Sequence, residues 1–105
     1  MAPIRPVDMR RPVRLVFRPL GRHKADGLAH ICHSAPEELG KIEIDSNLRG
    51  RPLLETIIHE LIHIIFPSMQ ESDVRRAGRY LALCLWAWGI RLDEDEIKAL
   101  VDRDK

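Results

Sequence analysis

The pattern of hydrophobic and polar residues changes its period near the middle of the chain. In the first half, short apolar runs are bounded by proline or glycine, which is typical of β-strands. Three segments fit this description: Arg14–Arg18, Gly27–His33 and Gly40–Asp45. The last alternates polar and apolar residues and places Ile42 and Ile44 on one face. Three short strands in succession, joined by brief loops, predict a small antiparallel sheet.

The second half of the chain predicts helices. From Leu53 to Phe66 the sequence is apolar on nearly every side of a helix, with Pro52 suited to the first turn and Pro67 to the end. The abundant isoleucine would also suit a strand, but a run of fourteen residues is too long for one. A helix this apolar needs cover on most sides, so we expect it between the sheet and a second helix.

Two further helices are expected after this run. Ser68-Met69-Gln70-Glu71 has the form of a capping box that opens a second helix, and Gly89 is a stop signal. Asp93 or Asp95 is a suitable N-cap for a short third helix. From Leu81 onward the second helix has no polar face, so we expect that half to be buried. Its predicted core residues are Val74, Ala77 or Gly78, Leu81, Leu85 and Trp88, with Cys84 as a small core residue and Trp86 in the core or an interface.

These elements predict an α+β fold in which a three-stranded antiparallel sheet packs on a buried helix. A chain of 105 residues is one domain by length, which we place at residues 13–105, after an extended arm at residues 1–12. Residues 1–24 carry seven basic side chains against one acidic one, a net charge of +6. A solvated tail explains this charge, and contact with nucleic acid is the alternative.

The composition is that of a soluble globular protein, with 45% apolar and 31% charged residues. No apolar run approaches the roughly eighteen residues of a membrane span, and Met1–Arg11 lacks the apolar segment of a secretory signal. Cys32 and Cys84 are far apart in sequence, which favours two free thiols over a disulfide. We therefore expect a cytoplasmic protein without a membrane partner.

The predicted buried helix carries a motif with specific chemistry, His59-Glu60-Leu61-Ile62-His63. Histidines at i and i+4 lie one turn apart on one helix face, so both imidazoles can bind one tetrahedral ion. Imidazoles are costly on an apolar helix unless their ring nitrogens are satisfied, which favours a metal over two core histidines. Glu60 points about 100° away around the helix. It therefore lies beside the ligands, where the general base for a metal-bound water belongs.

Zinc needs at least a third protein ligand, which we expect downstream of the motif. Pro67 turns the chain just after the histidines, so the first turn of the second helix should lie near His63. Glu71 is our preferred ligand and Asp73 the alternative. Glu71 could instead complete the capping box with Ser68 or pair with Arg75 at i+4.

Other polar residues are weaker candidates. His30, Cys32 and His33 could bind a metal, but on a strand His33 faces away from the other two, so the three cannot converge. Tyr80 could donate a hydrogen bond to an oxyanion if it faced the cleft, which the sequence does not decide.

The stretch Leu53–Arg91, with its HExxH motif, Glu71 and an apolar helix closed by glycine, resembles small zincin-like metallopeptidases of phage and bacterial type, which are minimal relatives of the gluzincins. The resemblance implies a small antiparallel sheet packed on the metal helix, with one strand edging the cleft. It also implies His59, His63 and Glu71 as zinc ligands and Glu60 as the catalytic base. The chain differs from larger gluzincins because Glu71 follows the second histidine by only eight residues.

We expect a zinc-dependent hydrolase, a small peptidase with one Zn²⁺ per chain. A chain of this length builds only a shallow cleft, which favours a flexible protein segment bound along a strand edge as the substrate. The alternative is a catalytically inactive, zinc-stabilised module that binds a partner protein. A nucleic-acid accessory that uses the basic arm is the third possibility.

Overall fold

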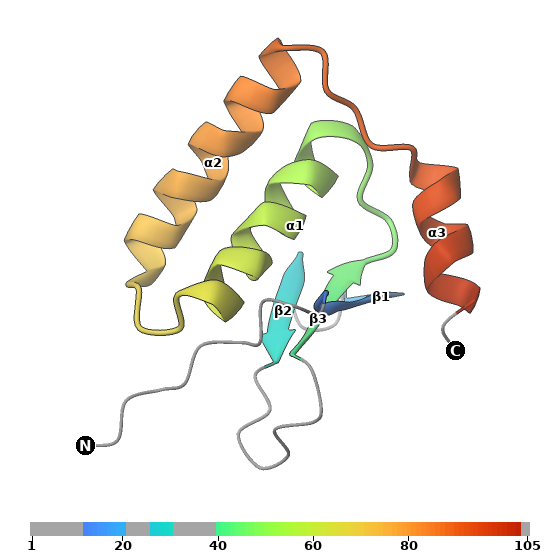
Figure 1. The fold of residues 1–105 in the computed structure, drawn as a ribbon, viewed down its shortest axis with the longest axis horizontal. Coiled ribbons are helices and arrows are strands. Elements are labelled where there is room, and N and C mark those ends of the chain that lie inside the picture. Colours follow the sequence, from blue (N-terminus) through green and yellow to red (C-terminus); the bar gives the residue numbers. More distant parts are fainter. Residues whose placement is uncertain (1–11, 21–25, 31–39, 104–105) are drawn as a thin grey trace.

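The computed structural model describes residues 12–20, 26–30 and 40–103, which form an α+β fold (Figure 1). The strands are β1 (Arg14–Arg18), β2 (Gly27–His30) and β3 (Lys41–Asp45), and the helices are α1 (Gly50–Ile65), α2 (Glu71–Ala87) and α3 (Glu94–Arg103). This confirms the predicted fold class and the order of its elements. The predicted arm lies outside the described residues except for Pro12, as do positions 31–33 of the second predicted strand.

The sheet is mixed, so the prediction of a purely antiparallel sheet is wrong for one of its two strand pairs. β3 lies in the middle, antiparallel to β2 and parallel to β1. The prediction assumed that each strand pairs with the next one along the chain. Instead β1 and β2 occupy opposite edges, and the chain returns to the centre with β3. β2 lies between β1 and β3 in the chain, so it forms part of the crossover connection that these two parallel strands require.

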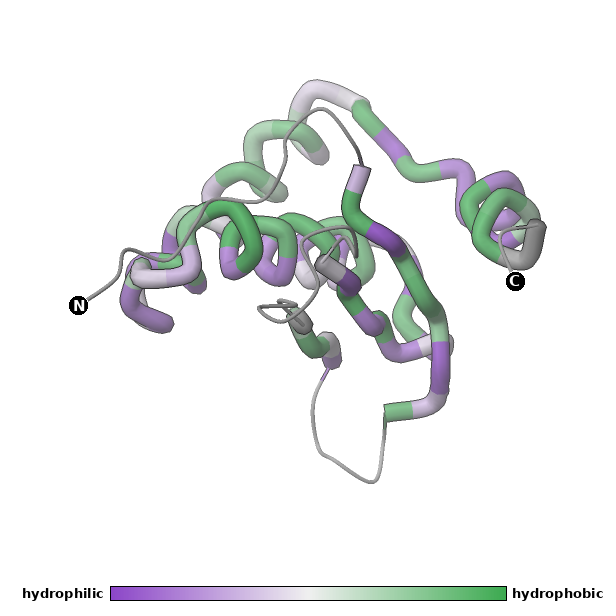
Figure 2. The backbone as a smooth tube through the Cα atoms, turned by 60° about the horizontal axis from the view of Figure 1, so that its bottom comes forward, coloured by the Kyte–Doolittle hydropathy of each residue, from purple (hydrophilic) through white to green (hydrophobic). Residues whose placement is uncertain are grey.

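The hydrophobic core lies between the sheet and α1. Ile42 and Ile44 of β3 are buried and pack with Leu53 and Ile64 of α1, which confirms the predicted inward orientation of the two isoleucines. α1 contacts β2, β3 and α2, and Figure 2 shows hydrophobic residues along most of its length. The nearly all-round apolar pattern of this helix is therefore explained by neighbours on several sides.

α1 and α2 lie side by side, joined by a short turn (Figure 1). The buried stripe of α2 consists of Val74, Gly78 and Ala82. A Cβ atom at Gly78 would lie only 3.4 Å from the Cα atom of His59. The glycine therefore lets the two helices approach closely at the level of the predicted metal ligands.

The second half of α2 is more exposed than the sequence predicted. Leu81 and Trp88, expected in the core stripe, are 47% and 71% exposed, and Cys84 is a half-buried free thiol. α2 packs chiefly on α1, so only the narrow face that meets α1 is covered. The prediction for Val74 and Gly78 is confirmed, and that for Leu81 and Trp88 is wrong.

The ends of the later helices follow local sequence signals. Gly89 has a φ angle of +83°, and its N–H and that of Ile90 donate to carbonyls in the last turn of α2, the pattern of a Schellman motif. The Oδ1 atom of Asp93 accepts a 3.0 Å hydrogen bond from the N–H of Glu96 at the start of α3, so the predicted N-cap is confirmed. None of the described helices is long and apolar enough to cross a membrane.

Candidate metal centre

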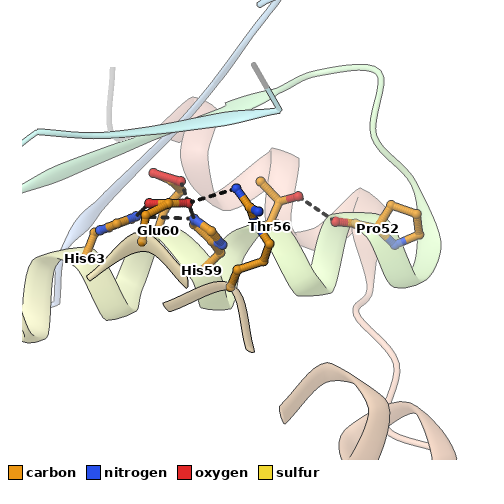
Figure 3. A network of polar contacts seen from close by, with 7 residues as sticks. Pro52, Thr56, His59, Glu60 and His63 are labelled. Carbon is orange, nitrogen blue, oxygen red and sulfur yellow. Dashed lines mark hydrogen bonds and ion pairs between the residues drawn. The ribbon is translucent and has the colours of Figure 1, made fainter. Parts of the chain in front are cut away.

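The imidazole rings of His59 and His63 converge on the same side of α1 (Figure 3). Their Nε2 atoms are 3.2 Å apart and their ring centroids 4.9 Å apart. Two donors about 2.0–2.1 Å from one tetrahedral ion lie roughly 3.3 Å from each other. The separation of the two nitrogens therefore fits a shared metal ion.

Glu71 reaches the same point from the first residue of α2. Its Oε1 atom lies 2.9 Å from Nε2 of His59, and its Oε2 atom lies 2.7 Å from Nε2 of His63. The short turn after α1 brings the carboxylate back over the imidazoles. Two nitrogens and one carboxylate thus face a common point from two helices, and all three groups can donate to a single cation.

The predicted capping box at the start of α2 is wrong. α2 begins at Glu71 itself, with Gln70 as the N-cap residue and no side-chain hydrogen bond to cap the helix. The Glu71 carboxylate contacts the two histidines and does not take part in a capping box with Ser68. Asp73, the alternative ligand, is exposed and does not line the cleft that contains the histidines.

Glu60 lies beside the histidines and is buried, with 7% exposure. Its Oε1 atom is 3.9 Å from Nε2 of His59. A Cβ atom at Gly27, the first residue of β2, would lie 2.9 Å from Cγ of Glu60 and 2.8 Å from Cγ2 of Thr56. The missing side chain of Gly27 therefore leaves room for Glu60 between α1 and β2. His59, Glu60 and His63 offer ligand atoms within 4.8 Å of one another, close enough to hold a metal ion.

These residues lie in an open cleft of about 740 Å³. α1, β2 and the first half of α2 line it. β2 is an edge strand in the strand order of the described sheet. A ligand in the cleft would therefore lie between the backbone of an edge strand and the two histidines.

Several polar residues lie differently from what the sequence suggested, or were not anticipated. Tyr80 is 66% exposed and outside the cleft lining, so it is not placed to stabilise an oxyanion. Cys32 and His33 of the rival cluster lie outside the described residues. Arg75 and Arg79 do line the cleft. Their spacing of four and eight residues from Glu71, which puts all three on one helix face, was the sequence signal for this arrangement.

No known family model matches the chain, and no curated protein or solved structure is significantly similar to it. The chemistry of the cleft is therefore inferred from its own residues and their geometry.

Proposed function

We propose that the chain is a zinc-dependent peptidase that holds its metal with His59, His63 and Glu71. The observation that carries this proposal is the convergence of two imidazole nitrogens and a carboxylate, at separations from 2.7 to 3.2 Å, inside a cleft. Without a cation, the two Nε2 atoms face each other across a distance at which at most one of them can accept a hydrogen bond from the other. A shared cation satisfies all three groups at once.

Zinc is the proposed metal because of the donor types. Magnesium and calcium prefer sites made of oxygen atoms, whereas two imidazoles favour zinc or a neighbouring transition metal. Two histidines and one glutamate form a ligand set in which zinc keeps a fourth position open for water or substrate. An open position in a cleft is what a catalytic site needs and a purely structural site does not.

Glu60 is the proposed general base. When bound, zinc would polarise the carbonyl of the substrate and increase the acidity of a water molecule. The Glu60 carboxylate lies beside the ligands, 3.9 Å from His59 Nε2. In the proposed mechanism it takes the proton from the attacking water at a carboxylate oxygen and later gives it to the leaving amine.

The position of β2 supports a peptide as the substrate. An extended peptide can add to the edge strand of a sheet through main-chain hydrogen bonds. Gly27 of β2 lies against Thr56 and Glu60. A peptide that paired with this strand would therefore pass directly by the proposed base.

A zinc-stabilised module that binds a partner protein is the second candidate. The observation that favours it is the exposure of apolar side chains on α2 and at its C-terminal end, among them Leu81 and Trp88, because exposed apolar surface can mark interaction sites. In this alternative, zinc would only join α1 to α2, and Glu60 would have no catalytic part.

The first prediction separates these two functions with the substitution Glu60→Gln. The zinc-loaded chain and the variant are incubated with a pool of unfolded proteins, and new peptide termini are identified by mass spectrometry. We expect cleavage by the unmutated chain and a loss of roughly a hundredfold or more in the variant, because the proton acceptor is removed. Zinc content and Tm should stay unchanged, because Glu60 is not one of the proposed ligands.

Glu96→Gln makes the same chemical change at an exposed position of α3 and is the matched control, which should cleave normally. Equal cleavage by Glu60→Gln and the unmutated chain would contradict the proposed mechanism. Absence of cleavage by every protein, across several substrate pools, would favour the binding module.

A further inference from the structure

The cleft has a charge pattern that the proposed mechanism does not use, and it bears on which peptides the proposed peptidase accepts. We propose that Arg75 and Arg79 make the cleft selective for peptides with an acidic side chain close to the cleaved bond. This inference rests on the proposed function, because it treats the cleft as a peptide-binding site.

Arg75 and Arg79 share one face of α2 with the metal-facing Glu71, and all three line the cleft. At a rise of 1.5 Å per residue, the two arginines stand about 6 and 12 Å along the helix from Glu71. α1 and α2 are antiparallel neighbours joined by a short turn (Figure 1). A Cβ atom at Gly78, between the two arginines in sequence, would lie 3.4 Å from Cα of His59, so Arg75 lies alongside the histidines. Arg79, which pairs with Glu55, lies beyond them on the side away from the turn.

The guanidinium group of Arg75 is available for a further anion. It lies 4.0 Å from Oε1 of Glu71, at the outer limit of an ion pair, and its side chain is 62% exposed. The same carboxylate oxygen is much closer to His59, at 2.9 Å. Glu71 is thus engaged by the imidazoles, and Arg75 retains the planar set of N–H donors that binds a carboxylate through two hydrogen bonds.

Arg79 is paired with an acidic residue, but only weakly. Its Nε atom lies 3.8 Å from Oε1 of Glu55, and the two side chains are 69% and 37% exposed. Exposed ion pairs of this kind contribute little to stability, so a carboxylate from a bound peptide can compete with Glu55. Removing the charge of Glu55 should therefore strengthen the preference for an acidic peptide.

One cationic group of the cleft lies beside the histidines and the other lies beyond them on one side. Among the described residues that line the cleft, Arg75 and Arg79 are the only arginine or lysine side chains, and Pro67 lines the opposite end. The Arg75 guanidinium lies 4.0 Å from the Glu71 carboxylate, and Arg79 stands one helical turn farther along α2, about 6 Å or two residues of an extended peptide. The acidic side chain is expected beside Arg75 or about two residues farther toward Arg79, close to the cleaved bond.

The test measures binding by the full chain carrying Glu60→Gln and loaded with zinc, so that bound peptides are not cleaved. The probes are fluorescein-labelled peptides about ten residues long, enough to span the cleft in extended form, with a single glutamate moved along the sequence. Each has a twin with glutamine in the same place. Fluorescence anisotropy should show that the best glutamate peptide binds roughly fivefold tighter than its twin. The difference should disappear with Arg75→Gln and increase with Glu55→Gln.

Arg76→Gln is the matched control, because it removes the same charge from the adjacent residue, which is exposed and does not line the cleft. All variants are compared at equal zinc occupancy, since Arg75 lies near Glu71. Equal binding of every glutamate peptide and its twin would overturn the inference, as would equal losses in Arg75→Gln and Arg76→Gln.

Cleavage is scored separately with the unmutated active-site sequence, so the two proposals can fail independently. Cleavage without any charge preference in binding would overturn the selectivity and leave the peptidase intact. Charge-selective binding without cleavage would support the proposed recognition by Arg75 and Arg79 and contradict the proposed peptidase activity.

Discussion

α1 and the second half of α2 have similar apolar sequences but different surroundings. Leu53 and Ile64 of α1 are fully buried, whereas Leu81 of α2 and Trp88 at its C-terminal end are 47% and 71% exposed. α1 has β2, β3 and α2 as neighbours, whereas α2 packs chiefly on α1. The apolar pattern of a helix shows how much surface it could bury, and the number of packed neighbours determines how much it does bury.

The polar residues of the two helices lie where both helices border the cleft. His59, Glu60 and His63 lie on the largely apolar α1 where it borders the cleft, between β2 and α2. Glu71 and Arg75 lie on the first half of α2, which lines the same cleft. The candidate site is therefore formed where polar faces of two helices meet, and the exposed apolar half of α2 lies beyond it.

The comparison of the two helices can be tested by truncating one apolar side chain in each. Ile64→Ala should lower the free energy of unfolding by about 2–5 kcal/mol, because it leaves a cavity in a fully packed core. Leu81→Ala should lower it by less than about 1 kcal/mol, because much of that side chain is already in water. Urea denaturation of both variants measures the difference. Similar losses would mean that the second half of α2 is covered in solution.

A smaller effect is expected from the two acidic residues in the first turn of α2. Glu71→Gln should weaken zinc binding by at least about tenfold, since the carboxylate faces both imidazoles. Asp73→Asn is the control and should leave the affinity nearly unchanged. Competition with a chromogenic chelator measures both affinities. The reverse ranking would transfer the ligand role to Asp73.

The parts of the structure that the sequence predicted correctly depend on short-range signals. Alternating residues and flanking proline or glycine located the strands, and Pro67 was sufficient to infer that Glu71 would approach His63. The parallel pairing of β1 with β3 could not be predicted in this way, because it depends on which strand takes the centre of the sheet.

The exposure of Trp88 and the position of Arg75 were missed for related reasons. A periodic apolar stripe does not reveal how many neighbours will cover it, so Trp88 was assigned to the core. An arginine on a helix surface is usually solvated, and Arg75 becomes part of the cleft only once Glu71 is placed against the histidines. Both features depend on the arrangement of α1 and α2 rather than on either helix alone.

The central claim is that His59 and His63 of α1 and Glu71 of α2 together hold one zinc ion, and elemental analysis of the purified chain tests it most directly. The unmutated protein should contain about one zinc per chain. His59→Ala and His63→Ala should each lose nearly all of it, because too few protein ligands remain. Cys84→Ser, a change in α2 away from the cleft lining, should retain the metal. Full zinc content in both histidine variants would contradict the claim.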